Sequence, residues 1–505
     1  MIRILVADKL SHKGMEVLKR DGGSQVEVKT DLPRAQLIAE IPKYHGLVVR
    51  SATKVTAEVI EAAQNLKIVG RAGIGTDNID VEAASKRGII VINAPEGNSV
   101  TTAEHAIALM LSLSRNIPQA TASMRRGEWE KSKFMGVEVC HKTLGIIGLG
   151  RIGKLVAQRA QGLGMVTIAY DPFISSDAAQ VLGVSLVELD ELLARSDYIT
   201  VHTPKTDATT HLIGIQEFEK MRPGVRIINC ARGGIIAEQA LYQAIVEGKV
   251  AGAAVDVFEQ EPPGDHPLLG LDAVICTPHL GGSTEEAQDN VAVEVAEQIL
   301  SFFQKGEIRN AVNVPVLSSE SYAELKPYWG LMAKLGRLVA QLAEGGLRQL
   351  TISYSGEVAD QEIRFLTVTF LEGLLGVFLQ EQVNLVNASI LARERGIKVV
   401  KSISSETEDF ASLVKVEAWT DRDGCSVAGT LYGRKDARLV QIDGYSVETI
   451  LSGHLLIFSN PDMPEVVGRV GTILGNNHIN IAEMHLGRKT SGGMATAIIN
   501  VDSQV

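Results

Sequence analysis

Residues 143–171 read TLGIIGLGRIGKLVAQRAQGLGMVTIAYD, and this stretch predicts the fold of the unit that contains it. The apolar run 143–147 is typical of a buried strand, and the pattern Gly148-x-Gly150-x-x-Gly153 follows it directly. A helical pattern comes next, and a second apolar run ends on an aspartate about 20 residues beyond the glycines. A glycine turn between strand and helix, with an acid closing the next strand, is typical of a β-α-β unit that binds a dinucleotide.

Each residue of this pattern has a physical task if a dinucleotide binds. Gly148 permits the tight turn, Gly150 lets the backbone approach the pyrophosphate, and Gly153 lets the helix pack closely on the strand. The amides at the start of the helix then face the negative phosphates. Asp171 accepts hydrogen bonds from both ribose hydroxyls and repels a 2′-phosphate, which favours NAD over NADP. The alternative is a tight turn that binds no ligand.

Short apolar runs alternate with amphipathic segments on both sides of this unit, which is the rhythm of parallel sheets covered by helices. We predict an α/β fold with two doubly wound, Rossmann-like lobes: residues 1–96 as a substrate-binding lobe and 97–282 as an NAD-binding lobe. The amphipathic segment that follows is predicted to return as a helix, so that residues 283–312 complete the first lobe. A catalytic cleft is then expected between the lobes, outside the carboxyl ends of the strands.

The rest of the chain is predicted to form two further units, because 505 residues are too many for the cores of two lobes alone. Residues 313–446 mix helical and alternating strand patterns, which predicts an α+β intervening domain. Residues 452–505 follow the order strand, helix, strand, strand, which is the beginning of a ferredoxin-like unit.

Three inferred strands of the second lobe end in chemically active residues beside glycines or prolines: Arg232, Glu261 and His279. These types suit the oxidation of a 2-hydroxy acid. The planar fork of Arg232 can hold a carboxylate, and His279 can accept the hydroxyl proton as hydride leaves. Glu261 can fix the imidazole tautomer and stabilise imidazolium. Taken singly, the three could instead be a surface ion-pair residue, a solvated acid and a turn histidine.

Four segments together resemble the D-2-hydroxyacid dehydrogenase family, and most closely its D-3-phosphoglycerate dehydrogenase branch. They read GLGRIG, NCARGG, DVFEQEP and TPHLG, and they begin at residues 148, 229, 256 and 277. The resemblance covers residues 1–312 and implies that Arg232, Glu261 and His279 are the substrate clamp, the supporting acid and the acid/base. Around the cofactor it implies Gly148, Gly150, Arg151, Ile152, Gly153, Asp171, Thr203, Cys230, Ala231, Asp256, His279 and Gly281.

The same resemblance implies NAD-dependent oxidation of 3-phosphoglycerate to 3-phosphohydroxypyruvate, the first step of phosphorylated L-serine synthesis. Arg50, Ser51, Arg71 and Asn98 match first-lobe segments that contact the substrate in the family, next to Arg232. The two first-lobe arginines could instead be solvated charges. Two other functions stay open: reduction of a small 2-oxo acid such as hydroxypyruvate or glyoxylate, and an NAD-sensing scaffold similar to a corepressor.

The C-terminal half resembles the long type of this branch, with an intervening domain and a terminal ACT domain that binds an amino acid. The effector implied is L-serine, and Asn460 and Asn480 match positions that bind it, although both could be turn asparagines. Glu465 stands where the family has a glycine, and the unit is expected to be incomplete at Val505. Both features put serine control in question.

Composition narrows the partners and the compartment. The net charge of −11 argues against nucleic acid, and no run reaches the ~18 apolar residues of a membrane span. The first residues do not form a secretory signal. The four cysteines lie far apart without a Cys/His cluster, so neither a disulfide framework nor a metal site is expected. We expect a cytoplasmic homo-oligomer, a dimer or a tetramer.

Overall fold

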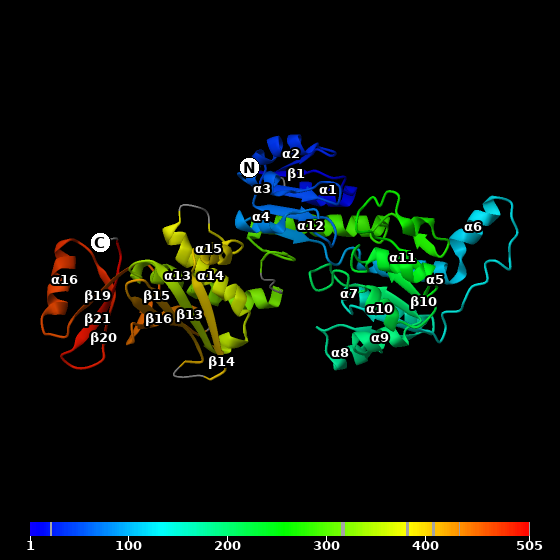
Figure 1. The fold of residues 1–505 in the computed structure, drawn as a ribbon. Helices are drawn as coiled ribbons and strands as arrows, with labels where there is room; N and C mark the ends of the chain where they lie inside the picture. The colour runs from blue at the N-terminus through cyan, green and yellow to red at the C-terminus, as the bar shows by residue number, and fades with distance from the viewer. Residues whose placement is uncertain (21–22, 315–318, 380–382, 407–409, 434, 504–505) are drawn as a thin grey trace.

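A computed structural model describes residues 1–20, 23–314, 319–379, 383–406, 410–433 and 435–503. Four sheets carry the fold, and they lie along an extended molecule (Figure 1). The first sheet stands between the second, which contains the glycine turn, and the third, and the fourth lies at the far end beside the third. The expected class is therefore confirmed: two parallel α/β lobes, a mixed-sheet domain and a small antiparallel domain.

The first lobe is a five-stranded sheet in the order β2-β1-β3-β4-β5, and every pairing is parallel. Helices cover both faces, and the central strand β3 is therefore apolar and buried along its whole length. Its elements are β1 (Ile2–Val6), α1 (His12–Lys19), β2 (Ser24–Val28), α2 (Arg34–Glu40), η1 (Ile41–Lys43), β3 (Gly46–Val49), α3 (Ala57–Ala62), β4 (Ile68–Arg71), α4 (Val81–Lys86) and β5 (Ile90–Asn93).

The second lobe is a seven-stranded parallel sheet in the order β12-β11-β10-β9-β6-β7-β8. The strand order reverses between β6 and β9, and the crevice at such a reversal is the usual ligand site of a doubly wound sheet. Its elements are α5 (Ser99–Arg115), α6 (Ile117–Arg125), β6 (Thr143–Ile147), α7 (Arg151–Gly162), β7 (Val166–Tyr170), α8 (Ser176–Val181), β8 (Ser185–Leu186), α9 (Leu189–Arg195), β9 (Tyr198–Val201), α10 (Ile215–Lys220), β10 (Val225–Asn229), α11 (Glu238–Val246), β11 (Val250–Val255), η2 (Pro267–Gly270) and β12 (Val274–Cys276).

The chain returns to the first lobe through the long helix α12 (Glu285–Lys305), which packs against α1 and β4. Beyond it, the Val312 amide donates to the Val91 carbonyl (2.8 Å), and Ala311 forms an antiparallel bridge with Ile92. The first lobe is thus built from two separate stretches of sequence. The chain passes between the lobes through α5 and α12. Arg232 of the second lobe lies 3.1 Å from Asp77 of the first, so the loops of the two lobes meet there.

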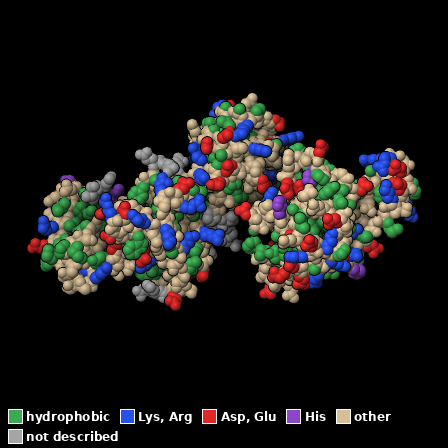
Figure 2. Space-filling model, viewed as in Figure 1, with side chains coloured by type: hydrophobic (Ala, Val, Ile, Leu, Met, Phe, Trp, Pro, Cys, Tyr) green, Lys and Arg blue, Asp and Glu red, His purple; other side chains and the backbone are tan. Residues whose placement is uncertain are grey.

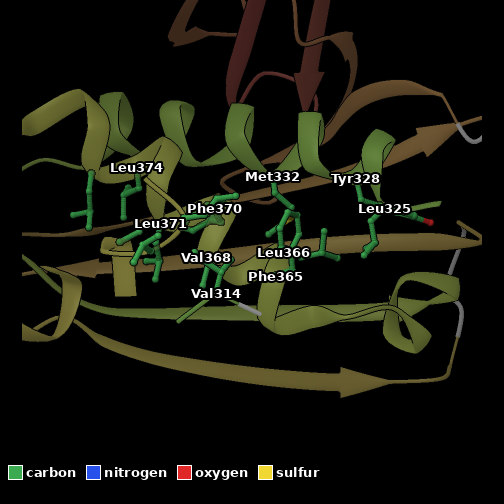
Figure 3. Packing of buried hydrophobic residues seen from close by; sticks show 14 of the residues in the cluster. Val314, Leu325, Tyr328, Met332, Phe365, Leu366, Val368, Phe370, Leu371 and Leu374 are labelled. Atoms are coloured by element: carbon green, nitrogen blue, oxygen red, sulfur yellow. The ribbon is translucent and has the colours of Figure 1, made fainter. Parts of the chain in front are cut away.

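The third unit is a six-stranded mixed sheet, β14-β13-β15-β16-β17-β18, covered by α13 and α14. Buried apolar side chains of both helices fill the space above the sheet (Figure 3). The helices touch closely because Gly336 faces the Phe370 carbonyl, which a Cβ at Gly336 would approach to 2.2 Å. The elements are α13 (Ser319–Leu342), β13 (Leu347–Gly356), η3 (Glu357–Asp360), α14 (Ile363–Phe378), α15 (Ala388–Glu394), β14 (Lys398–Ser404), β15 (Ser412–Thr420), β16 (Gly424–Tyr432), β17 (Asp436–Ile442) and β18 (Tyr445–Ile450).

The last unit is a three-stranded antiparallel sheet, β19-β21-β20, with one helix. Its elements are β19 (His454–Pro461), α16 (Val466–Asn476), β20 (Ile481–Arg488) and β21 (Met494–Val501), the β-α-β-β order read from the sequence. Among the described helices of the whole chain, none is both long and apolar enough to span a bilayer. On the face shown in Figure 2, acidic and basic side chains are intermixed.

Candidate active site

The glycine turn lies at the point where the strand order reverses. Gly148 has φ +92°, and a Cβ there would come within 2.7 Å of the His202 carbonyl oxygen at the end of β9. A Cβ at Gly153 would lie 2.1 Å from the Gly148 carbonyl oxygen, so helix and turn touch directly. Gly150 precedes the first residue of α7, and a Cβ there would meet no described atom within 4 Å. The turn therefore offers open backbone at a helix N-terminus, which suits a pyrophosphate.

Asp171 directly follows β7 and lies beside this turn. Its Oδ2 accepts the Leu149 amide (2.8 Å) and its Oδ1 accepts the Phe173 amide (2.9 Å). A carboxylate has about four lone-pair sites, so each oxygen can still accept a ribose hydroxyl. The same bonds fix the carboxylate at the mouth of the turn.

The end of β9 adds polar atoms without partners in the described part of the chain. The buried Thr203 Oγ1 is one, and its Cγ2 would lie 2.8 Å from a Cβ at Gly148. Burial lowers the pKa of His202 to about 4, so its imidazole is neutral there. Arg151 begins α7 and reaches Glu96 of the first lobe (Nη2 to Oε1, 3.8 Å), with Ile152 next to it. The unpaired Thr203 hydroxyl, the open N-terminus of α7 and the Asp171 carboxylate could each bind a part of NAD.

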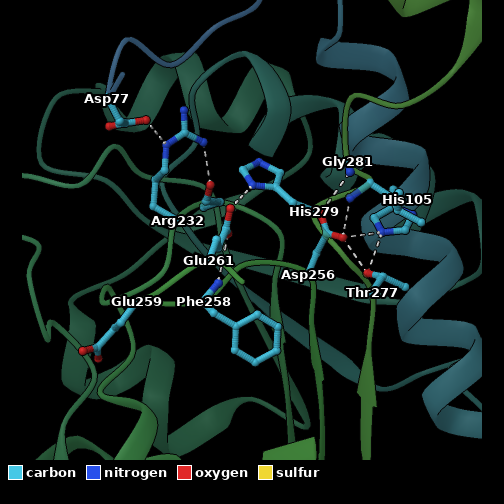
Figure 4. A network of polar contacts seen from close by, with 12 residues as sticks. Asp77, His105, Arg232, Asp256, Phe258, Glu259, Glu261, Thr277, His279 and Gly281 are labelled. Atoms are coloured by element: carbon cyan, nitrogen blue, oxygen red, sulfur yellow. Dashed lines mark hydrogen bonds and ion pairs between the residues drawn. The ribbon is translucent and has the colours of Figure 1, made fainter. Parts of the chain in front are cut away.

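Glu261 and His279 form a hydrogen-bonded pair in the loops that follow the neighbouring strands β11 and β12 (Figure 4). The Nδ1 of His279 lies 2.8 Å from Glu261 Oε2, and Glu261 Oε1 accepts the Phe258 amide (3.1 Å). Because the carboxylate accepts only, the proton lies on Nδ1 and the lone pair of the neutral ring lies on Nε2. About half of each side chain is exposed, 48% for His279 and 40% for Glu261, so substrate can reach the ring.

Arg232 crosses from the second lobe to the first. Its Nε donates to Asp77 Oδ2 (3.1 Å), and its Nη1 donates to the Ala231 carbonyl (2.7 Å). Figure 4 shows its guanidinium on the same side of the site as Glu261 and the His279 ring. A substrate that contacts both lobes can therefore meet the arginine fork and the imidazole together.

Asp256 lies behind the pair and is fully buried. Its carboxylate accepts the Leu280 amide (2.7 Å), the Gly281 amide (2.9 Å) and the Thr277 hydroxyl (2.5 Å). Burial alone would raise the pKa of Asp256, but hydrogen bonds from His105, Thr277 and the Leu280 amide outweigh it and hold the pKa below its usual range.

The Cys230–Ala231 segment lines the same region. Burial raises the pKa of the Cys230 thiol, so it stays protonated, and the Ala231 amide donates to the Asn229 side chain (3.1 Å). His105 also contacts Asp256 (3.2 Å), and sequence reasoning did not include it in the site. The two residues are 151 positions apart in the sequence, so there is no local signal, and only the packing of α5 on the sheet brings them together.

The predicted first-lobe residues include two arginines, Arg50 and Arg71, and the charges of Arg50 and Arg232 both act on Arg71. Arg71 ends β4, its Nε has no partner among the described residues, and burial with the charge of Arg232 lowers its pKa to about 10. Arg50 is tied through its amide to Asp8 (2.6 Å), and Ser51 follows it on the surface. Asn98, at the start of α5, has a buried Oδ1 without a described partner.

The two asparagines predicted to bind an effector lie at opposite ends of the terminal sheet. Asn460 pairs with Ala495, whereas Asn480 precedes Ile481, which pairs with Val501. Their partner positions on β21 are therefore six steps apart along the strand, roughly 20 Å at a strand's rise per residue. Glu465 precedes α16 in the left-handed region, with φ +78°.

Comparisons with known proteins identify the family of the chain. Residues 107–281 match the family model of the D-isomer specific 2-hydroxyacid dehydrogenase NAD binding domain, and residues 324–443 match that of the D-3-phosphoglycerate dehydrogenase intervening domain. The structure of a glyoxylate reductase from Paecilomyes thermophila is similar to this one, with 31% sequence identity and a TM-score of 0.58. The match covers 62% of this chain and 98% of the reductase chain. The structure of an NAD-dependent formate dehydrogenase from Staphylococcus aureus, in complex with NAD, is also similar, with 30% identity and a TM-score of 0.55. That match covers 61% of this chain and 98% of the formate dehydrogenase chain.

Fold and site together define an NAD-dependent dehydrogenase of the D-2-hydroxyacid type. The D-3-phosphoglycerate dehydrogenase of Archaeoglobus fulgidus is 47% identical over 99% of this chain and 95% of its own length. The D-3-phosphoglycerate dehydrogenase of Methanocaldococcus jannaschii is 46% identical over 100% of this chain and 96% of its own length. The chain belongs to the D-3-phosphoglycerate dehydrogenase family, and the expected cofactor, NAD, is confirmed.

Proposed function

We propose that this chain oxidises 3-phosphoglycerate to 3-phosphohydroxypyruvate with NAD, the first step of phosphorylated L-serine synthesis. The observation that carries the proposal is the match to D-3-phosphoglycerate dehydrogenases along the whole chain, including the intervening domain. The comparisons give neither the 2-oxo acid reductase nor the corepressor-like scaffold an advantage over this function. A shared fold would not separate the three, since it also hosts the glyoxylate reductase.

The protein side of the chemistry follows from the proposed roles of three residues. Arg232 holds the substrate carboxylate in its fork and orients C2. His279 takes the C2 hydroxyl proton on Nε2, because Glu261 keeps the other proton on Nδ1. Glu261 then stabilises the imidazolium that forms. Bound NAD supplies the acceptor for the hydride from C2.

Residues around the glycine turn would hold that cofactor. The amides that follow Gly150, with Arg151 and Ile152, face the pyrophosphate, Asp171 holds the ribose, and Thr203 supplies an unpaired hydroxyl. Cys230, Ala231, Asp256 and Gly281 would line the nicotinamide side. Of these, Asp256 acts through the turn it holds, since its oxygens already accept protein donors.

The phosphate would lie against Arg50, Ser51, Arg71 and Asn98. The partly exposed Arg71 has a buried Nε without a described partner and lies near Arg50 and Arg232, which makes a cationic site that an anion would stabilise. Phosphate is a suitable anion because its oxygens accept from a guanidinium fork and from hydroxyl and amide groups together.

The test is NADH oxidation with 3-phosphohydroxypyruvate, hydroxypyruvate and glyoxylate, for the wild type and Arg71→Met. We expect the wild type to prefer the phosphorylated acid at least 100-fold in kcat/KM, and the variant to lose most of that preference while its activity on hydroxypyruvate changes little. Arg34→Met, which removes an arginine paired with Glu58 on the lobe surface, is the control. Preference for an unphosphorylated acid would keep the cofactor and refute the substrate.

We also propose that the protein is a homo-oligomer, a dimer or a tetramer. Helix α6 and the loop after it project from the second lobe (Figure 1). They expose Met124, Trp129 and Met135, with Trp129 80% exposed. Exposed apolar groups on a projecting arm favour burial against another copy. Light scattering would test this, and a dimer that Trp129→Glu leaves intact would exclude the arm as the contact.

L-serine is the proposed effector, and it would require two copies of the chain. Because Asn460 and Asn480 lie at opposite ends of one sheet, one copy cannot bring both to a single ligand. Serine inhibition that depends on protein concentration would support a site between copies.

Unpaired cysteines suit a cytoplasmic location, and a net charge of −11 gives no basis for a nucleic-acid partner.

A further inference from the structure

The turn that carries His279 is organised around a buried carboxylate. The Asp256 oxygens accept the amides of Leu280 and Gly281, and the Asp256 carbonyl accepts the His279 amide (2.9 Å). His279 itself has φ +55°, a conformation that side chains other than glycine rarely adopt. Such a conformation persists only where its surroundings enforce it. Here the enforcing group is Asp256.

His105 ties this carboxylate to a helix of the core. Its Nε2 lies 3.2 Å from Asp256 Oδ1 and 3.2 Å from Thr277 Oγ1 (Figure 4). Since Asp256 only accepts, the imidazole donates to it through Nε2–H. Helix α5 is held against the sheet by its buried neighbours Ala103, Ala106 and Leu109, so His105 approaches from a rigid support.

We propose that His105 is a positioning residue for hydride transfer: it anchors Asp256 and Thr277 to helix α5 and thereby fixes the turn that presents the His279 imidazole. The inference rests on the proposed acid/base role of His279. His105 does not reach the reacting atoms, and its effect passes entirely through Asp256 and Thr277.

A metal site is the alternative use of these residues, because ligand atoms of His105, Cys230 and Asp256 lie within 4.8 Å of one another. The hydrogen bonds argue for the positioning role. Asp256 already accepts two amides, a hydroxyl and the imidazole N–H, which fill the lone pairs that a metal would need. Burial also keeps the Cys230 thiol protonated, whereas a metal binds the thiolate.

The experiment compares His105→Leu, which removes the donor, with His105→Gln, whose terminal amide can donate from a similar distance along the side chain. We expect His105→Leu to lower kcat roughly 10- to 100-fold, the scale of a slight misplacement of a catalytic group. The Kd for NADH should stay within about threefold of wild type, and His105→Gln should recover most of the activity. His211→Leu, which removes an exposed histidine paired with Glu259 in the same lobe, is the control and should behave as wild type.

Hydrogen exchange in the cofactor-free protein gives a readout independent of turnover. In His105→Leu the amides of Leu280 and Gly281 should exchange at least tenfold faster, while the amides of α5 keep their protection. Thr277→Val tests the same turn if His105→Leu does not fold, and it too should speed exchange at both amides.

Several results would overturn the proposal. If His105→Leu changes neither kcat nor the hydrogen exchange of the Leu280 and Gly281 amides, the histidine only packs. If Thr277→Val leaves that exchange unchanged, Thr277 does not help to hold the turn. Loss of wild-type activity on chelation, restored by zinc, would replace the hydrogen-bond role with a metal site. Failure of the proposed function can be told apart from failure of this proposal. If the wild type does not turn over 3-phosphohydroxypyruvate, the proposed function is wrong, but the predicted faster exchange in His105→Leu can still be tested.

Discussion

Replacing Glu261 by glutamine tests the acid/base assignment most directly, because the two oxygens of this residue have different partners. Oε2 accepts from His279 Nδ1 (2.8 Å) and Oε1 accepts the Phe258 amide (3.1 Å). A glutamine has one acceptor oxygen. If that oxygen stays with Phe258, its NH2 faces Nδ1 and drives the ring proton to Nε2, where it blocks proton acceptance. If it turns to His279, a donor faces the Phe258 amide.

The size of the effect follows from the hydrogen bond to charged imidazolium. Such bonds contribute about 1.5–3 kcal/mol, and the pair's exposure of 48% and 40% favours the lower part of that range because solvent screens it. A loss of about 1.5–2 kcal/mol in the transition state lowers kcat/KM roughly 10- to 30-fold. The assay is steady-state NADH oxidation with 3-phosphohydroxypyruvate, with the NADH Kd measured by fluorescence and expected to stay near wild type.

Glu259→Gln is the matched control, since it removes the same charge two residues away, where the carboxylate pairs with His211 (3.2 Å). It should retain activity within about twofold. Equal activity of Glu261→Gln and wild type would refute the supporting role of this carboxylate. An equal loss in both variants would show that net charge, and not the geometry of the pair, is responsible.

Three further changes test other parts of the reasoning. Asp171→Ala should weaken NADH binding and raise the ratio of NADPH to NADH activity at least tenfold; a variant that still rejects NADPH would place the discrimination elsewhere. Glu465→Gly should stabilise the terminal unit by up to about 1 kcal/mol, because φ +78° is costly for a side chain, and an unchanged or lower calorimetric transition would contradict this. Burial and the charge of Glu96 raise the pKa of Glu294 to about 6. A raised folded pKa makes the folded state bind more protons, so wild-type stability should fall as pH rises from about 4.5 to 6, by up to roughly 1 kcal/mol, and Glu294→Gln should flatten this dependence in urea titrations.

Local patterns in the sequence were sufficient for most of the fold. Strands at the centre of the parallel sheets, such as β3 and β9, are buried along their whole length and consist of short apolar runs, so each can be recognised from its own sequence. The amphipathic segment after residue 282 is predicted to return as a helix, and α12 spans Glu285–Lys305. Short or exposed elements, such as β8 and α6, lack such a pattern, and neither was predicted.

In the site, some features could be predicted from local sequence motifs, whereas others depend on the tertiary structure. The glycine turn, Asp171, Arg232, Glu261 and His279 lie in short motifs whose residue types already state a chemistry, so the sequence was enough to propose them. Contacts between distant segments could not be read in this way: Arg232 with Asp77, or His105 with Asp256, depend on how helices and lobes pack. The left-handed turn at His279 depends on the same packing, since four donors must converge on one buried carboxylate. Chemistry resides in residue types, and distances between those residues arise only when the chain has folded.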